Sequence, residues 1–386
     1  MKLEGVRVLD LSMFLPGPHL TQMMADHGAD VIKVEPPAGE PVRHVGYRTA
    51  DGVSVWFRNT HRNKRSVVLD LKTEAGREAL LRLAETADVM VEAFRPGVVD
   101  RLGVGPAQVR ARNPRLVYAS IAAFGQTGPE AQRPAHDPAI QAMAGTSSLN
   151  LGADGEPTPM GVPAADMAAS LMTLSAILMA LLRRVQTGRG DYIDMSMQDA
   201  LMAWLPNVTG PVFAEDRAPV VKHERSFGGF AFARAYRTKD GRHVALGGVE
   251  HKFVRNLLNA LDRPDLIPAA EGPPGPGQDP VKAFLAETFA HRTRDEWEAW
   301  FEGRDVCFAP VLDLHEAFHR PQIAAREMLV RDADGNLHIG LPIKFAEEPG
   351  RLDPRLPALG EHTEAVLREA GLPEDLIAAV LAGRTG

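Results

Sequence analysis

The sequence predicts an α/β protein with a parallel sheet in its first half and a smaller α+β unit further along the chain. Residues 6–120 alternate short β-branched runs with amphipathic stretches of helical length, which is the pattern of repeated βαβ units. Residues 226–309 show a separate mixture of strand and helix patterns. A chain of 386 residues that is 45% hydrophobic also has enough apolar side chains for two cores.

Six strands are expected in the first half, and the stretches between them are long enough for helices. The strands lie at residues 6–11, 30–34, 67–69, 89–92, 116–120 and 192–195. The first helix begins near Pro18 and ends before Gly28, the usual residues at the two ends of a helix. Thr73 and Glu74 form a suitable cap for the helix that continues through residues 78–86.

The second half contains a different unit between two irregular segments. A long apolar helix over residues 166–186 comes first. Two segments then lack any clear hydrophobic periodicity, namely residues 207–225 and 310–350, and we interpret both as linkers. The elements expected beyond residue 225 are one strand at 244–246 and helices at 252–261, 281–289, 294–301, 363–370 and 375–382.

Composition excludes several classes of partner and compartment. The formal charge of −7 provides no basic face for nucleic acid or for an anionic membrane. The only cysteine, Cys307, can form neither an internal disulfide nor a thiolate metal cluster. The N-terminus lacks a signal-peptide pattern, and the longest apolar stretch, residues 167–182, is short for a membrane span. We therefore expect a cytoplasmic protein that acts on a small molecule.

Common cofactor and hydrolase motifs are absent from the sequence. Glu35 follows the second strand as a ribose-binding acid would, but the turn at residues 12–18 has only Gly17 where a dinucleotide fingerprint needs three glycines. The sequence also has no P-loop, no HExxH pattern, no paired-cysteine spacing and no Gly-x-Ser-x-Gly elbow. We expect no NAD, no metal and no serine nucleophile.

Three acid–base residues remain as catalytic candidates, and each also has a simpler structural interpretation. Asp166 begins the long apolar helix, where an acid favours the helix dipole or caps the first turn. His136 follows a Gly/Pro-rich turn and could be a surface loop histidine. Glu250 follows a strand and precedes a helix, where an acid is common. Position alone favours the structural interpretation for Asp166 and His136.

A family resemblance runs in order along nearly the whole chain. The segments that carry it are VLDLS at 8–12, GADVIKVE at 28–35, NKRSV at 63–67, LDLK at 69–72, VEAFRPG at 91–97, DRLG at 100–103, FGQTGP at 124–129, GRG at 188–190 and DMS at 194–196. Together they resemble the class III CoA-transferase and α-methylacyl-CoA racemase superfamily, also called CaiB/BaiF. Because many motifs agree in order, the resemblance is specific.

The resemblance implies a domain arrangement and an oligomeric state. It implies a large Rossmann-like domain built from residues 1–206 and completed by helices in residues 351–386. A small domain over residues 226–309 lies between the linkers at 207–225 and 310–350. Two such chains are expected to thread through each other as an interlocked homodimer.

The resemblance also implies that coenzyme A lies along the large domain as part of the substrate, with no permanently bound cofactor. Lys72, Phe94 and Arg101 correspond to residues that approach its adenine and phosphates, and Arg65 is a weaker candidate. A position that is often Asn in the transferase branch is Ala93 here, which removes one contact. Cationic side chains are what a phosphate-rich ligand needs on an acidic protein.

Two branches of the superfamily assign different chemistry to the same aspartate. In the transferase branch, the residue matching Asp166 attacks the thioester as a nucleophile, and no histidine is required. In the racemase branch it is a base that faces a histidine across the α-carbon, and a glutamate supports that histidine. His136, Asp166 and Glu250 occupy the three matching positions.

Local motifs point to both branches. The stretch at residues 246–253 contains Glu250, as the racemase branch does, whereas residues 162–169 are more similar to the transferase branch. The longer glycine-rich flap of the transferases is reduced to Gly228 and Gly229. We expect a racemase or epimerase first and a CoA-transferase second. A non-catalytic CoA-binding homologue ranks last, because a scaffold has no need of three acid–base residues.

Overall fold

The computed structural model describes residues 1–152 and 154–383 and divides into two compact units. The first unit contains Met1–Ala144, Met160–Trp204 and the described chain from Pro321 onward. The second contains the described residues of Gly145–Pro159 and Leu205–Arg320. Residues 384–386, the end of the expected segment 351–386, lie outside the described residues.

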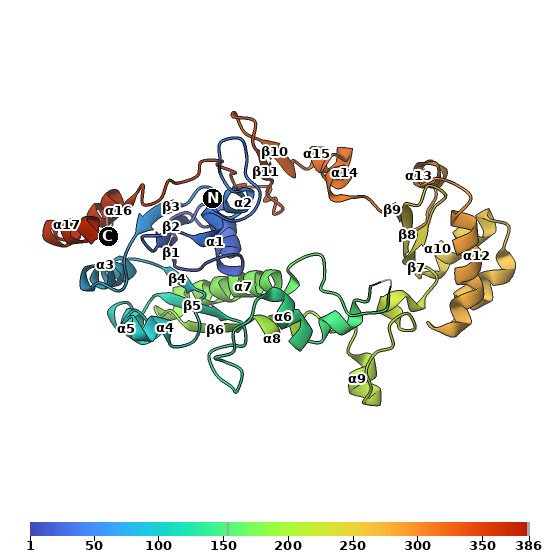
Figure 1. Ribbon diagram of the computed structural model, residues 1–386, viewed down its shortest axis with the longest axis horizontal. Helices are drawn as coiled ribbons and strands as arrows, with labels where there is room; N and C mark the ends of the chain where they lie inside the picture. The colour runs from blue at the N-terminus through green and yellow to red at the C-terminus, as the bar shows by residue number, and fades with distance from the viewer. Residues whose placement is uncertain (153, 384–386) are drawn as a thin grey trace. The chain divides into compact units, whose positions relative to one another are not determined.

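The first unit is built on a six-stranded parallel sheet, as predicted (Figure 1). Its strands run in the spatial order β3-β2-β1-β4-β5-β6, the order of a doubly wound α/β sheet. Their bounds are β1 Arg7–Asp10, β2 Asp30–Glu35, β3 Arg65–Val68, β4 Val89–Glu92, β5 Val117–Ala122 and β6 Tyr192–Ser196. The inner strands are almost entirely buried because helices cover both faces of the sheet.

The side chains of β1 alternate between two separate cores. Val8 packs with α1 (Pro16–Asp26) and α7 (Ala164–Thr187), whereas Leu9 packs with α3 (Glu74–Glu85) and the C-terminal helices. Successive residues of a strand point to opposite faces, so one short strand contributes to both cores. The other helices of this unit are α2 Val55–His61, α4 Val98–Arg101, α5 Pro106–Arg112, α6 Asp137–Met143, α8 Met197–Met202, α15 Pro321–Ala325, α16 Thr363–Glu369 and α17 Glu374–Ala382.

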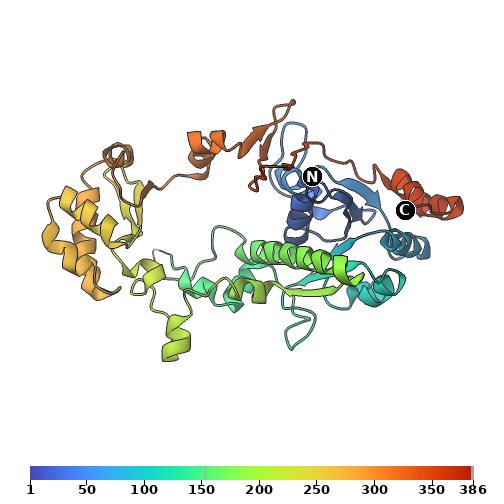
Figure 2. The ribbon, with the colours of Figure 1, turned by 180° about the vertical axis from the view of Figure 1, so that it is seen from behind.

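The C-terminal helices return to the first sheet. Figures 1 and 2 both show α16 and α17 beside α3, although almost 300 residues separate them along the chain. The β3 edge holds this return, because the Ser66 hydroxyl accepts from the Gly360 N–H at 2.8 Å and the Val68 N–H donates to the Thr363 hydroxyl at 3.0 Å. Leu367 and Ile377 complete the second core.

The second unit has an antiparallel sheet packed against helices. Its strands are β7 Ala233–Arg237, β8 His243–Gly247 and β9 Phe308–Pro310 in the order β7-β8-β9. Its helices are α9 Gly210–Glu215, α10 His251–Ala260, α11 Ile267–Ala270, α12 Asp279–Phe289, α13 Arg294–Phe301 and α14 Leu314–Phe318. Phe289, Trp297 and Phe301 form its aromatic centre.

Both irregular segments contain short elements that the sequence pattern did not reveal. The segment 207–225 includes α9, and the segment 310–350 includes α14, α15 and the antiparallel pair β10 Leu329–Arg331 and β11 Leu337–Ile339. Elements of three to six residues are too short to show a hydrophobic period. The strand β7 was missed for a similar reason, since three of its five residues are exposed or charged at Arg234, Ala235 and Arg237.

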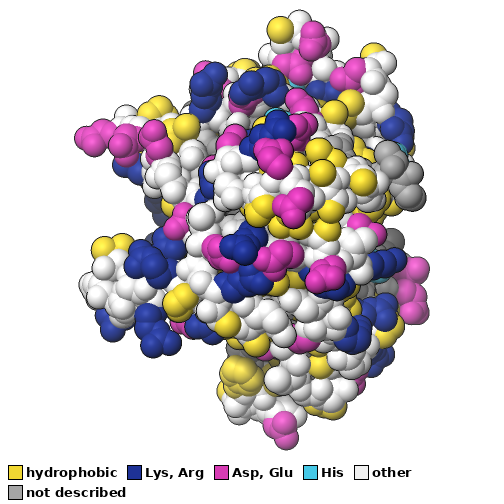
Figure 3. Space-filling view, turned by 90° about the vertical axis from the view of Figure 1, so that its left-hand side faces the viewer, with side chains coloured by type: hydrophobic (Ala, Val, Ile, Leu, Met, Phe, Trp, Pro, Cys, Tyr) yellow, Lys and Arg dark blue, Asp and Glu magenta, His cyan; other side chains and the backbone are white. Residues whose placement is uncertain are grey.

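The surface near the C-terminal helices carries both signs of charge. Figure 3 shows basic and acidic side chains interspersed on the face that lies at the left of Figure 1. Ion pairs such as Arg112 with Glu78 at 2.6 Å and Arg65 with Glu369 at 2.6 Å account for part of this mixture. Such a face has no extended field of one sign that would attract a polyanion.

Candidate active site

A cavity of about 990 Å³ lies in the first unit at the carboxyl ends of β1, β4, β5 and β6. This is where the strand order reverses between β1 and β4, the position at which open α/β sheets bind their ligands. The walls come from loops that are far apart in sequence. They include Met13, Phe14, Trp56, the residues 93–96, Ile121, Arg133, His136, Asp137, Asp166 and Met197.

Asp166 reaches this cavity from the first turn of α7. Among the described residues, no hydrogen-bond donor contacts its carboxylate. Burial, assisted by the negative charge of Asp137, raises the pKa of Asp166 to about 7. A carboxyl group with this pKa can both give and take a proton near neutral pH.

The N-terminus of α7 is capped by Asp137 instead of Asp166. Asp137 is 7% exposed, and its Oδ2 accepts from the N–H groups of Ala165 at 2.8 Å and Asp166 at 3.1 Å. Its other oxygen accepts from the Gln141 side chain. The helix amides are therefore satisfied by a neighbouring loop. This leaves the Asp166 carboxylate free for chemistry, and it corrects the interpretation of Asp166 as a helix cap.

His136 faces the same cavity from the N-cap position of α6, but its side chain does not cap that helix. Its ring contacts the ring of Phe14 nearly edge to face, with centroids 5.9 Å apart and an interplanar angle of 82°. Within the described residues of the first unit, no hydrogen bond involves the His136 imidazole. The structure thus brings His136 and Asp166 to one cavity, although 30 residues separate them in sequence.

Glu250 belongs to the second unit, where it is exposed at the N-cap position of α10. Its side chain makes no capping hydrogen bond. Glu250 is therefore an acid at the start of a helix, as its simpler interpretation expects, although it does not cap that helix. Its role beside His136 stays a prediction.

A second cavity of about 200 Å³ adjoins the first, and Met13 and Phe94 line both. Lys72 lines this second cavity together with apolar residues that follow β1, β2 and β3. Lys72 and Arg101 are exposed, and neither has an ion-pair partner among the described residues. Arg101 ends α4, next to the loop that contains Phe94.

Arg65 is placed differently from the other three predicted CoA contacts. It begins β3, at the amino end of the strand, and, like Arg101, it lines neither of these two cavities. Its guanidinium is paired with Asp30 at 2.7 Å and with Glu369 at 2.6 Å. A phosphate would have to displace both carboxylates from Arg65.

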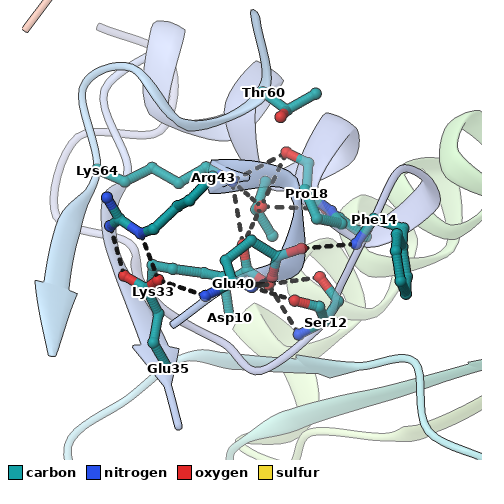
Figure 4. Close-up of polar contacts among 12 residues, drawn as sticks. Asp10, Ser12, Phe14, Pro18, Lys33, Glu35, Glu40, Arg43, Thr60 and Lys64 are labelled. Atoms are coloured by element: carbon teal, nitrogen blue, oxygen red, sulfur yellow. Dashed lines mark hydrogen bonds and ion pairs between the residues drawn. The ribbon is translucent and has the colours of Figure 1, made fainter. Parts of the chain in front are cut away.

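A buried network of charges lies beneath the loop that joins β1 to α1 (Figure 4). Asp10 accepts from the Lys64 ammonium at 3.0 Å, and Lys33 lies between Asp10 and Glu40 at 3.7 Å and 3.1 Å. These four side chains are at most 4% exposed, and their charges cancel. Burial alone would raise the pKa of Asp10, but Lys33 and Lys64 hold it below its usual value. Paired charges of this kind are tolerated in a core only when each has its partner.

Sequence reasoning missed Asp137 and Glu40. Asp137 directly follows a catalytic candidate and precedes Pro138, a pattern that marks a helix start, so its cap of the distant α7 could not be recognised locally. Glu40 sits in a loop without periodicity. Its contact with Phe14 arises only when the ends of β1 and β2 come together.

The chain is an α/β protein with a doubly wound sheet, and an acid and a histidine line the cavity at its switch point. In this class of protein, ligands bind at the carboxyl ends of the strands. The family can then be assigned from similarity. CoA-transferase family III matches residues 3–363, and the chain belongs to that family.

Relatives in both branches are similar over almost their full length. The acetyl-CoA:oxalate CoA-transferase of Acetobacter aceti is 34% identical over 96% of this chain and 96% of that protein. The α-methylacyl-CoA racemase of Homo sapiens is 32% identical over 98% of this chain and 95% of that protein. The crystal structure of a CaiB/BaiF family protein from Brucella suis superposes with a TM-score of 0.82 at 33% identity, covering 95% of this chain and 99% of that one.

Proposed function

We propose that this protein is an enzyme that binds an acyl-CoA thioester in the two adjoining cavities of the first unit. Lys72 lines the second cavity, and Arg101 directly precedes Leu102, which also lines it. Both are cations without carboxylate partners in the described chain, and Phe94 offers a flat apolar surface that lines both cavities. Phosphates need cationic donors, and an adenine needs an aromatic or apolar wall. Arg65 is a weaker candidate because its charge is already paired.

The reaction that this site supports best is racemisation or epimerisation at the α-carbon of the thioester. The observation that carries this proposal is that Asp166 and His136 line one cavity, and that burial raises the pKa of Asp166 to about 7. A 1,1-proton transfer needs one group to remove the α-proton and a second to return a proton to the opposite face. Histidine ordinarily titrates near neutrality and suits the second role. Glu250 would stabilise the charged form of the His136 ring.

CoA transfer between carboxylic acids is the second candidate. It is favoured by the absence of any hydrogen-bond donor at the Asp166 carboxylate in the described chain, which leaves both oxygens available as nucleophiles. In this reaction a carboxylate oxygen attacks the thioester carbonyl and the C–S bond breaks, which yields an acyl aspartyl anhydride and CoA thiolate. The thiolate then attacks the aspartyl carbonyl and releases the first acid. The acceptor acid completes the cycle by the reverse steps.

One pair of assays separates the two reactions. The protein is incubated in D₂O with 2-methylacyl-CoA thioesters, and uptake of deuterium at the α-carbon is followed by mass spectrometry. In parallel, formation of a new CoA ester is measured with free dicarboxylic and fatty acids as acceptors. Uptake that is lost in His136→Ala supports the racemase proposal. Transfer that persists in His136→Ala, without uptake by the wild type, supports the transferase.

We also propose an intertwined homodimer in the cytoplasm, with no permanently bound cofactor, no nucleic-acid partner and no membrane partner. The helix α7 is long and apolar enough to cross a membrane by length and composition alone, yet its buried residues, from Ala164 to Ile177, pack into the core of the first unit. Its second half exposes Met179, Leu182 and Val185, the last by 82%. A second copy of the chain would cover these apolar residues.

A further inference from the structure

Phe14 combines an unusual backbone conformation with a contact to His136. Its φ of 64° lies in the left-handed region, which bulky residues rarely adopt. Its ring lies between Trp56, with centroids 6.5 Å apart, and the His136 imidazole at 5.9 Å. A strained residue that touches a catalytic candidate calls for an interaction that holds it there.

Glu40 supplies that interaction. The Phe14 N–H donates to the Glu40 Oε1 at 2.9 Å, and Figure 4 shows the Glu40 carboxylate facing Phe14. Glu40 is only 1% exposed, and its N–H donates to the Glu35 Oε2 at 2.9 Å. A hydrogen bond to a buried carboxylate is among the stronger ones in proteins.

The charge network holds the other side of the same loop. Lys33 contacts Glu40 at 3.1 Å and also donates to the Ser12 carbonyl oxygen. The Asp10 carboxylate accepts from the Ser12 N–H at 3.0 Å. The backbone on both sides of Met13 is therefore tied to groups that cannot move without separating buried charges.

We infer that Glu40 is a positioning residue, which holds Phe14 in its left-handed conformation and thereby fixes the His136 imidazole against the Phe14 ring. The His136 side chain is exposed and has no hydrogen bond within the described residues of its unit, so the Phe14 ring is the described contact that can restrict its rotation there. The inference rests on the proposed function, because it matters for the reaction only if His136 carries a proton.

The first test removes the Phe14 ring without disturbing its backbone. Glycine tolerates a positive φ and keeps the N–H that Glu40 accepts, so Phe14→Gly isolates the ring. We expect kcat for α-proton exchange to fall on the order of 10- to 100-fold, with a smaller change in KM. Phe14→Tyr restores an aromatic ring and should recover most of the rate. If Phe14→Gly does not fold by circular dichroism, Phe14→Leu replaces it.

Glu40→Gln tests the hydrogen bond that positions Phe14. The amide keeps an acceptor oxygen but loses the charge opposite Lys33, so we expect a rate intermediate between the wild type and Phe14→Gly. Asp26→Asn is the matched control, because Asp26 is an equally buried acid on α1 that pairs with Arg62 at 2.7 Å and lines neither cavity. It should lower thermal stability without changing kcat.

The titration of the His136 ring provides a readout that does not depend on turnover. It is followed by NMR, with His136→Gln used to assign the signal. The charged groups that line the cavity with His136, namely Arg95, Arg133, Asp137 and Asp166, are unchanged in these variants. We expect the titration to shift in Phe14→Gly and Glu40→Gln but not in Asp26→Asn.

The outcomes separate the inference from the proposed function. An unchanged titration together with an unchanged kcat in folded Phe14→Gly, or in the folded Phe14→Leu substitute, overturns the inference. A shifted titration in an enzyme whose wild type shows no deuterium uptake supports the inference and rejects the racemase proposal. An equal shift of the His136 titration in Asp26→Asn would also overturn the inference, because it would reflect a general loosening of the first unit.

Discussion

At the scale of single residues, the site depends on which carboxylate is used for structure and which is left for chemistry. Asp137 satisfies the amides of α7, and Asp166, one position beyond Ala165, is left without a hydrogen-bond donor among the described residues. The two carboxylates are held close enough that the charge of one raises the pKa of the other. Two acids in different surroundings acquire different roles in this way.

Replacing Asp166 should remove activity and preserve the fold. Asp166→Ala deletes the base of the racemase and the nucleophile of the transferase, so turnover should be lost in both assays. The free energy of unfolding should not fall by the roughly 1 kcal/mol expected for a helix cap, because Asp137 performs that function. Chemical denaturation and both activity assays check this. Near-normal turnover would remove Asp166 from the mechanism.

The charge of Asp137 can be separated from its capping function. Asp137→Asn keeps an oxygen for the amides of Ala165 and Asp166 but removes the negative charge, so the pKa of Asp166 should move below about 7. Asp137→Ala should in addition cost about 1 kcal/mol of stability through the lost cap. Measured pH profiles of kcat/KM report the first effect. An unmoved acidic limb in Asp137→Asn would show that burial alone sets the pKa of Asp166.

The shape of the pH profile distinguishes the two reactions. The transferase needs only the Asp166 carboxylate, so its kcat/KM should fall as pH drops through about 7 and stay level above it. The racemase needs one proton shared between Asp166 and His136, so its profile should fall on both sides of a maximum. Profiles measured with deuterium uptake and with CoA transfer test this. A profile that rises toward low pH would contradict both mechanisms.

At the scale of secondary-structure elements, two loops that line the cavities are held by buried acids. Glu92 ends β4 and accepts from the Phe94 N–H at 2.8 Å, much as Glu40 accepts from Phe14. Glu92 is 1% exposed, and burial raises its pKa from 4.5 to about 7. The loops that carry Phe14 and Phe94 are thus each tied to a buried carboxylate.

Glu92 should make stability depend on pH. Its pKa is higher in the folded state than in the unfolded chain, so the folded state binds the proton more tightly. The free energy of unfolding should therefore decrease as pH rises from about 4.5 to about 7, by up to about 3 kcal/mol. Glu92→Gln should remove this decrease and be the more stable protein at pH 8. Urea unfolding at pH 5 and pH 8 measures it. If the free energy of unfolding depended on pH in the same way in the wild type and in Glu92→Gln, Glu92 would not be the group responsible.

At the scale of the whole molecule, two surfaces of the first unit differ in the side chains that they expose. The face near α16 and α17 mixes both charges (Figure 3), whereas the second half of α7 exposes Met179, Leu182 and Val185. Contiguous apolar side chains along one helix are what the proposed dimer would bury.

We expect sedimentation at micromolar concentration to show a dimer with twice the mass of one chain. Leu182→Asp should weaken it, because Leu182 is 72% exposed in the single chain and its replacement costs little within that chain. Buried in an interface, an unpaired aspartate would be costly. A folded wild-type monomer at this concentration would reject the dimer, and an unchanged Leu182→Asp dimer would place the interface elsewhere.

The local sequence pattern was enough to predict the helices and strands that have a strong hydrophobic periodicity. The observed bounds are within a few residues of the expected ones for the six parallel strands, for α3 with its Thr73 cap, and for the helices α10, α12 and α13. Long runs of this kind specify their own structure because the buried face repeats with the period of the element. The candidates His136, Asp166 and Glu250 came from family resemblance, since position alone favoured structural roles for His136 and Asp166.

The tertiary structure alone decided which of these residues lie together. No local signal places Asp137 at the amides of α7, Glu40 at the N–H of Phe14, or the Phe14 ring against His136. Each contact joins loops that meet only because parallel strands bring their carboxyl ends to one edge of the sheet. The same burial raises the pKa of Asp166, which in an extended chain would be an ordinary acid. Sequence periodicity determined the elements, and the juxtaposition of their ends determined which side chains share the cavity.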